Sequence, residues 1–381
     1  MTPLTRVLCH KGESGFMRVC IVEEIANCAY HLTTGLTRKG HDVVVILDVK
    51  RRLNRLLFTH SVQEGAEVKW IRPWPMRPRA LGLIIPMLLA IIRSRPHLVH
   101  AQYLWSQYFI GFIAAKLLGV PIVATGHGWE VLEVPKSQFR GRIQRWFLKR
   151  TDMVILTADY YQKHMEGLVA PENRVYIPRM IDTDTFRSGI DAEDLISKYG
   201  NRIVTFIARL HKIKTPEKTL QAFRIALDEF PDANLLILGI GEEEKNMRKV
   251  VEELGMVGNV HFLGEVSNTE IPKYLNASKV EVRGFNPDTP ELGISHLEAL
   301  ACETPILTYN DYADVGGMII CLEVPEIADN LKHILRDEDF QKRLGKEGRK
   351  YVIDNFGIDA ATDMTIRTYH TVLSRRKKRA R

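Results

Sequence analysis

The residues with the clearest chemical potential lie in Asn286–Pro305, NPDTPELGISHLEALACETP. Turn-forming residues lead to Gly293, and the apolar spacing of Ile294–Ala301 then predicts a helix. A helix that begins at a glycine presents free amide groups and the positive end of its dipole, which suits a phosphate. Glu298 lies just over one turn into this helix, where its carboxylate can accept hydrogen bonds from hydroxyl groups of the same ligand. The alternative is an ordinary loop–helix–strand unit with a solvated glutamate.

A second group of candidate residues follows the predicted strand Arg202–Ala208. Arg209 and Lys214 can neutralise a diphosphate, the arginine through forked hydrogen bonds and the lysine as a point charge. Further along, Gly239 and Gly241 predict a tight turn between a strand and a helix. The turn lacks the third glycine of the dinucleotide-binding fingerprint, so it indicates a turn at a cleft rather than a dinucleotide cofactor. A solvated basic loop is the alternative for the two cations.

His127 is the candidate in the first half of the chain. It stands between two glycines after the predicted strand Pro121–Thr125, at the sheet edge where ligands bind. The alternative is a loop histidine without a role. Asp182 and Asp184 have the spacing of a metal-binding DxD motif. They lie in a predicted linker with no strand end to support them, so we expect no metal there.

The order of the predicted elements supplies a framework for these residues. Strands alternate with helices from Arg18 to Ile177, and the alternation starts again at Arg202. This pattern predicts an α/β protein with two Rossmann-like, doubly wound parallel sheets. Ligands in such folds bind beyond the carboxyl ends of the strands, so the site is expected in a central cleft that the two domains face.

Composition and charge exclude several protein classes. The chain has 381 residues, of which 45% are hydrophobic and 26% charged, which is typical of a soluble protein with two domains. Its formal charge of +7 arises mostly from six basic residues within 375–381, so no nucleic-acid-binding face is expected. The five cysteines are odd in number and include no CxxC pair, which indicates free thiols in a reducing compartment.

The apolar segments predict a cytoplasmic protein with possible attachment to a membrane surface. Met1–Phe16 lacks the apolar core of a signal peptide, and the longest apolar stretch, Ala80–Ile92, is shorter than the roughly 20 residues of a membrane span. Met76–Arg93 and Phe139–Arg150 combine apolar and basic residues. With the basic C-terminal residues, they can lie peripherally on the anionic inner face of a membrane. The alternative is a pair of core helices with solvated basic faces.

Several motifs, taken in order, resemble one enzyme family. KGHDVVVI, RPHLVHAQYLW and LLGVPIVATGHG occur in the first half of the chain, and ARLHKIKTPEKTLQAF, LLILGIGEEE and HLEALACETPIL in the second. Together they resemble the retaining glycosyltransferases of family GT4, also called glycosyl transferase group 1. The resemblance runs from about Met17 to Leu373 and implies the GT-B fold. It also implies transfer of a sugar from a UDP- or GDP-linked donor to a glycan or lipid-linked acceptor, without a metal or other cofactor.

The resemblance also implies roles for individual residues. Arg209 and Lys214 would hold the donor diphosphate beside the turn of Gly239 and Gly241, and the amides of Gly293 and Ile294 would donate to it. Glu298 would bind the ribose hydroxyls, and His127 would lie over the transferred sugar as the catalytic residue. Glu291 is the nearest match to the family's first glutamate, which stands eight residues before the second; Pro290 occupies that position here.

The sequence pattern and the resemblance together divide the chain into five predicted segments. These are a disordered lead-in (1–16), an acceptor domain (17–185), a nucleotide-sugar donor domain (186–356), a helix returning to the first domain (357–374) and a basic tail (375–381). Because Ile25–Asn27 replaces the family's Gly-Gly loop and Pro290 its first glutamate, a catalytically impaired scaffold that binds nucleotide sugars or a membrane is one alternative. A different enzyme with two Rossmann-like domains, such as a nucleotide-sugar epimerase, is another.

Overall fold

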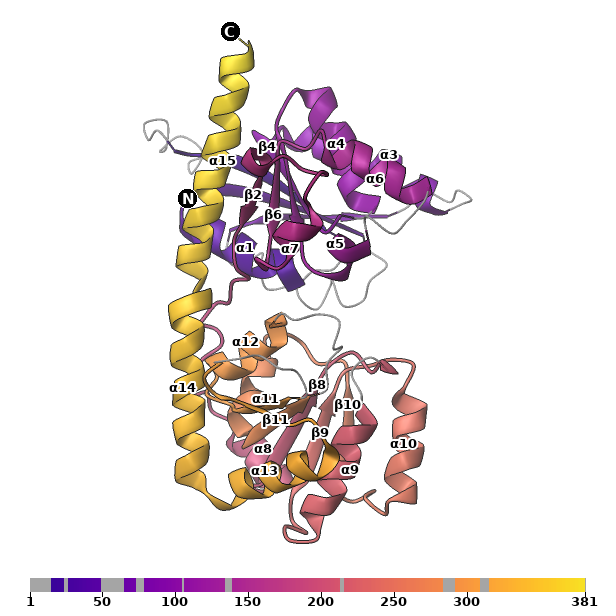
Figure 1. Ribbon diagram of the computed structural model, residues 1–381, viewed down its shortest axis with the longest axis vertical. Coiled ribbons are helices and arrows are strands. Elements are labelled where there is room, and N and C mark those ends of the chain that lie inside the picture. The colour runs from indigo at the N-terminus through magenta and orange to yellow at the C-terminus, as the bar shows by residue number, and fades with distance from the viewer. Residues whose placement is uncertain are drawn as a thin grey trace, which may run out of the picture. The chain divides into compact units, whose positions relative to one another are not determined.

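The computed structural model describes residues 15–23, 27–48, 65–72, 79–104, 106–133, 139–212, 216–283, 292–308 and 315–380. The chain forms two compact units (Figure 1). The N-terminal unit contains Met1–Arg179 and Ile358–Arg381, and the C-terminal unit contains Met180–Gly357. The chain therefore passes into the second unit six residues before the predicted boundary at 185.

The N-terminal unit is built on a sheet of seven parallel strands in the order β3-β2-β1-β4-β5-β6-β7. The strands are β1 (Arg18–Glu23), β2 (Asp42–Asp48), β3 (Glu67–Ile71), β4 (Leu98–Gln102), β5 (Ile122–Gly126), β6 (Met153–Leu156) and β7 (Arg174–Tyr176). The continuous β-branched run Val43–Ile46 of β2 is fully buried, as expected for a parallel sheet that is covered on both faces. The predicted doubly wound sheet is confirmed.

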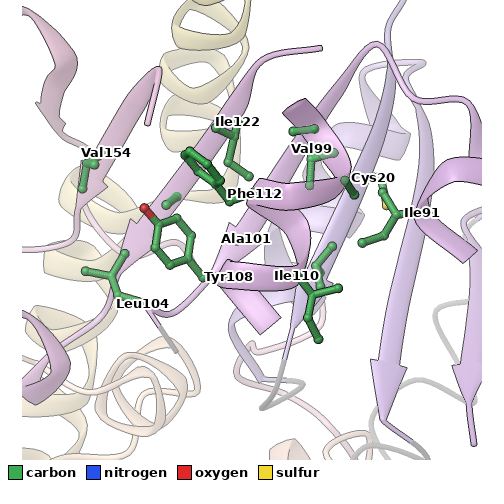
Figure 2. Packing of buried hydrophobic residues seen from close by; sticks show 14 of the residues in the cluster. Cys20, Ile91, Val99, Ala101, Leu104, Tyr108, Ile110, Phe112, Ile122 and Val154 are labelled. Atoms are coloured by element: carbon green, nitrogen blue, oxygen red, sulfur yellow. The ribbon is translucent and has the colours of Figure 1, made fainter. Parts of the chain in front are cut away.

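Helices cover the sheet of the N-terminal unit and form its core with it. They are α1 (Asn27–Arg38), α3 (Arg79–Ser94), α4 (Ser106–Leu118), α5 (Trp129–Glu133), α6 (Phe139–Leu148), α7 (Tyr161–His164) and α15 (Ile358–Ala380). Figure 2 shows Tyr108 and Phe112 of α4 among buried strand residues such as Ile122. The Tyr108 hydroxyl lies 2.6 Å from the hydroxyl of Thr151, so its polar end is also satisfied.

The C-terminal unit repeats this plan with six parallel strands in the order β10-β9-β8-β11-β12-β13. The strands are β8 (Ile203–Ile207), β9 (Asn234–Leu238), β10 (Val260–Gly264), β11 (Val280–Arg283), β12 (Ile306–Thr308) and β13 (Met318–Ile320). The helices are α8 (Glu193–Tyr199), α9 (Pro216–Leu227), α10 (Glu244–Glu253), α11 (Ile271–Ala277), α12 (Ile294–Ala301), α13 (Val324–Arg336) and α14 (Glu338–Phe356).

Helix α15 belongs to the N-terminal unit and extends further than the sequence predicts. It includes most of the predicted basic tail, because it continues to Ala380. It packs closely on α1: a side-chain carbon added at Gly35 would lie 2.0 Å from the Thr362 hydroxyl oxygen. Lys39 pairs with Asp363 at 3.1 Å, and Arg376 donates to the carbonyl of Val120 at 2.7 Å. These contacts hold the basic end against the unit.

Candidate functional site

His127 lies where β5 ends, at the carboxyl edge of the first sheet. Its amide donates to a Glu130 carboxylate oxygen on α5 at 2.5 Å, and its carbonyl accepts from Arg179. Its ring lies 4.6 Å from the ring of Tyr103, centroid to centroid. Its Nε2 lies 2.7 Å from the side-chain oxygen of Gln102, the last residue of β4. The ring is therefore held from two neighbouring strand ends.

The surroundings of His127 determine its protonation state. Burial holds its pKa well below the usual value, and the positive charge of Arg179 and the nearby His100 lower it further. The neutral ring carries one proton. That proton is on Nε2, because the amide oxygen of Gln102 can only accept. Nδ1 is then an acceptor; it is buried and has no hydrogen-bond partner among the described residues.

A buried polar chain connects this histidine to α15. Gln102 lies 3.3 Å from His100, and His100 lies 2.7 Å from the Thr125 hydroxyl and 2.6 Å from the Tyr369 hydroxyl. Sequence reasoning missed Gln102, His100 and Tyr369. The available signal was the strand LVHAQ, where His100 and Gln102 are two residues apart and so share one face of a strand that is otherwise apolar.

The burial of His100 predicts a pH-dependent stability of the N-terminal unit. Burial lowers its pKa to about 3, against about 6.5 when the chain is unfolded. Between these values only the unfolded chain binds the proton, so stability falls as the pH drops below about 6.5. Going from pH 7.5 to 5.5 should lower the free energy of unfolding by ~1 kcal/mol through His100 alone.

Urea unfolding at the two pH values tests this expectation. All five tryptophans lie between residues 70 and 146, so their fluorescence follows the N-terminal unit. His100→Asn should unfold at lower urea and show a smaller pH dependence than the wild type. An unchanged pH dependence in His100→Asn would contradict the assignment.

In the C-terminal unit, Arg209 stands two residues after β8, at the carboxyl edge of the second sheet. Its side chain is exposed and forms no ion pair within the described part of the chain. The glycine turn after β9 packs against the backbone on either side of it. A side-chain carbon added at Gly239 would lie 2.0 Å from the carbonyl oxygen of Ala208. One added at Gly241 would lie 2.1 Å from the carbonyl oxygen of Leu210. Both glycines therefore position the Arg209 segment.

Helix α12 begins directly after Gly293, as the sequence predicts, but its first turn is capped from within. The Gly293 amide donates to His296 Nδ1 at 2.9 Å. The expectation that this amide is open to a ligand is therefore not met. The Ile294 amide has no hydrogen-bond partner among the described residues, which is usual for the first turn of a helix. This end of α12 thus presents fewer donors than the sequence indicates, because a histidine side chain occupies one of them.

Glu298 lies on α12 next to a buried ion pair. Arg283, at the end of β11, pairs with Glu281 and donates to the Ser295 hydroxyl. Burial raises the pKa of Glu298 to about 8, an effect that Arg283 reduces and Glu281 increases. Burial also raises the pKa of Glu281. Sequence reasoning missed this cluster, although charged residues alternating with valine in the strand VEVR were a visible signal.

The remaining predicted residues either lie outside the described part of the chain or bind their own turn. Lys214 and Glu291 lie outside the described residues. Asp182 is buried and binds its own turn: its carboxylate accepts from the Asp184 amide at 3.2 Å and the Thr185 hydroxyl at 2.9 Å. Within the described ranges, no group of three His, Cys, Asp or Glu side chains could hold a metal ion. No helix among them is long and apolar enough to cross a membrane.

Two family models match the two halves of the chain. The model described as "Glycosyltransferase Family 4" matches residues 25–185. The model described as "Glycosyl transferases group 1" matches residues 190–351. The two matches follow each other without overlap and together cover most of both units.

Similar proteins and structures agree with these matches. N-acetyl-alpha-D-glucosaminyl L-malate synthase of Bacillus anthracis is 23% identical over 89% of this chain and 91% of its own. A GDP-mannose-dependent mannosyltransferase of Mycobacterium tuberculosis is 28% identical over 62% of this chain and 66% of its own.

Among solved structures, Anabaena HepE in complex with UDP and glucose has a TM-score of 0.74 at 16% identity, covering 92% of this chain and 99% of its own. Sucrose-phosphate synthase of Thermosynechococcus elongatus has a TM-score of 0.72 at 16% identity, covering 94% of this chain and 99% of its own. These likenesses show the GT-B fold. The chain is a glycosyltransferase and belongs to family 4, the glycosyl transferase group 1 enzymes.

Proposed function

We propose that this protein transfers a sugar from a UDP- or GDP-linked donor to a glycan or lipid-linked acceptor, with retention at the anomeric carbon. The main support is the position of Arg209 after the carboxyl end of β8. Its guanidinium group is exposed and has no ion pair in the described part of the chain. The glycine turn holds its backbone. A preorganised cation there would stabilise the departing diphosphate without a metal. Family membership and the names of the relatives support the reaction class.

The donor site in this proposal combines residues that follow β8 with residues of α12 and the segment before it. Arg209 binds the diphosphate with Lys214, and the Ile294 amide, which has no hydrogen-bond partner in the described part of the chain, adds a donor from α12. Glu298 binds the ribose hydroxyls. Burial raises its pKa because the buried carboxylate loses the hydrogen bonds that water would donate. In the complex, the ribose hydroxyls would donate hydrogen bonds in place of that water. Glu291 would contact the sugar in place of the family's first glutamate.

His127 is the proposed contact to the transferred sugar. Its neutral ring can accept a hydrogen bond from a sugar hydroxyl at Nδ1, the atom without a partner in the described residues. We further propose a peripheral position at the cytoplasmic membrane face, supported by the exposed Ile143 and Trp146 on the basic helix α6.

A scaffold that binds donors without transfer is the second candidate. It is favoured by one specific observation, the proline at the position of the family's first glutamate. Sugar transfer and donor binding distinguish it from the first candidate, because a scaffold would bind the nucleotide sugar and release no product.

Thermal unfolding with UDP, GDP, ADP and CMP in turn tests the donor site. A nucleotide at about 100 times its dissociation constant should add roughly 2.7 kcal/mol of stability. That corresponds to a rise of several degrees in the midpoint of a unit of this size. Arg209→Ala should abolish the rise, whereas Lys346→Ala, which removes an exposed cation of α14, should keep it. If no nucleotide raises the midpoint, the proposed donor site is wrong.

A further inference from the structure

A basic cavity lies at the amino edge of the N-terminal sheet, opposite His127. It has a volume of about 580 Å³, and its charged lining comprises Lys116, Lys149, Arg150, Arg375, Arg376 and one carboxylate, Asp152. Arg376 donates to the carbonyl of Val120, just before β5, whereas His127 follows the other end of that strand. Five strand residues at ~3.3 Å each separate the two places by roughly 15 Å. The cavity is therefore distinct from the candidate sugar site.

The single carboxylate in the cavity does not balance its cations. Asp152 is already engaged: it pairs with Lys116 at 3.6 Å and accepts from the Ile122 amide at 3.0 Å. Arg375 and Arg376 bind backbone carbonyls and the side-chain oxygen of Asn173, which fix their positions without neutralising their charge. With five cations and one carboxylate, the charged lining keeps a net charge of +4.

The ends of nearby helices account for only part of this excess. Cations commonly sit near the carboxyl end of a helix, where they stabilise the dipole. Helices α4 and α6 end beside the cavity. Each such end carries roughly half a negative charge, so together they offset on the order of one positive charge. Within the described residues, Arg375 and Arg376 each use only one of their two terminal nitrogens in these contacts, so guanidinium hydrogens remain for a ligand.

We propose that this cavity is a second binding site, for a ligand that carries phosphate groups. Guanidinium groups fit phosphate oxygens through forked hydrogen bonds, and the lysines add point charges. The volume falls within the range of ligand pockets, which is larger than a single phosphate requires. The phosphate can come from a soluble diphosphate or from an anionic lipid headgroup. The exposed Leu117 and Trp146 of the neighbouring α4 and α6 suit the second source.

Two probes with the full chain test the site and separate the sources. Inorganic pyrophosphate binding is measured by calorimetry, and sedimentation is measured with phosphatidylglycerol vesicles against phosphatidylcholine vesicles. The test variant is Lys149→Glu with Arg150→Glu, since both side chains are exposed at the end of α6. It should weaken binding of at least one probe ~10-fold or more. Added salt should weaken binding in the wild type as well.

Controls separate this site from the proposed donor site and from loss of fold. Lys346→Glu makes the same kind of charge change on α14 and should bind like the wild type. Arg209→Ala should keep the binding that the test variant loses, even if it loses nucleotide binding. The single variant Lys149→Glu guards against misfolding, because Lys149 is exposed and its side chain makes no hydrogen bond or ion pair among the described residues. If neither probe binds, or the Lys149 and Arg150 variants bind both probes like the wild type, the proposal is overturned.

Discussion

Replacing Arg209 with alanine is expected to lower the rate of sugar transfer by ~10²- to 10³-fold, the usual effect of removing one preorganised group that stabilises developing charge. The side chain is exposed and unpaired within the described residues, so its removal should leave the fold intact. The measurement is the rate of sugar transfer from the donor found by the nucleotide screen, together with the unfolding midpoint of the variant without ligand.

Two further variants sharpen this experiment. Arg209→Lys keeps the charge but loses the forked geometry, so it should recover only part of the rate. Lys346→Ala should transfer sugar at the rate of the wild type. Transfer at the normal rate by a folded Arg209→Ala protein would show that the diphosphate is bound elsewhere.

Replacing Arg283 with methionine is expected to destabilise the C-terminal unit by about 3–5 kcal/mol, because it leaves a buried charge without its partner. Arg283 is 2% exposed, and Glu281 is fully buried. Both Glu281 and Glu298 would then have to be protonated in the folded state. Hydrogen exchange of peptides that cover β11 and α12 measures the effect in this unit alone.

The pH dependence of this variant gives a second readout. A carboxyl group whose folded pKa is raised contributes stability below its unfolded pKa of about 4.5 and loses it as the pH rises. The cost of Arg283→Met should therefore be smaller at pH 5 than at pH 8. Arg224→Met removes an exposed ion pair with Asp228 and should cost no more than ~1 kcal/mol at either pH. Equal costs for the two variants would contradict the buried-pair assignment.

The fold was predictable where the sequence carries strong periodic signals. Runs such as Val43–Leu47 and Val204–Phe206 mark buried parallel strands, and their alternation with helices gave both sheets. Helix α8 was missed because it is short and lies in a segment rich in turn formers. The length of α15 was missed because a run of like charges reads as a tail, whereas carbonyls of the N-terminal unit hold Arg375 and Arg376 in place.

The site was predictable only where function follows from position on a strand. The positions of His127 and Arg209 could be predicted because they follow strand ends, where parallel sheets bind ligands. Their supporting residues could not be predicted. Tyr369 meets His100 across 269 positions of sequence, and no local pattern reveals such a pair. The engagement of the Gly293 amide by His296 was missed for a different reason: a histidine cap has no common sequence signature.

The division of the chain into units has a consequence for its synthesis. The first unit needs α15 to complete it, because Thr362 packs against Gly35 and Tyr369 bonds to His100. Those residues leave the ribosome after the whole of Met180–Gly357, which forms the second unit as one continuous stretch. Although domains generally fold in the order in which they are made, here the domain begun first is finished last. Until α15 has been made, the buried His100 lacks its hydrogen-bond partner Tyr369.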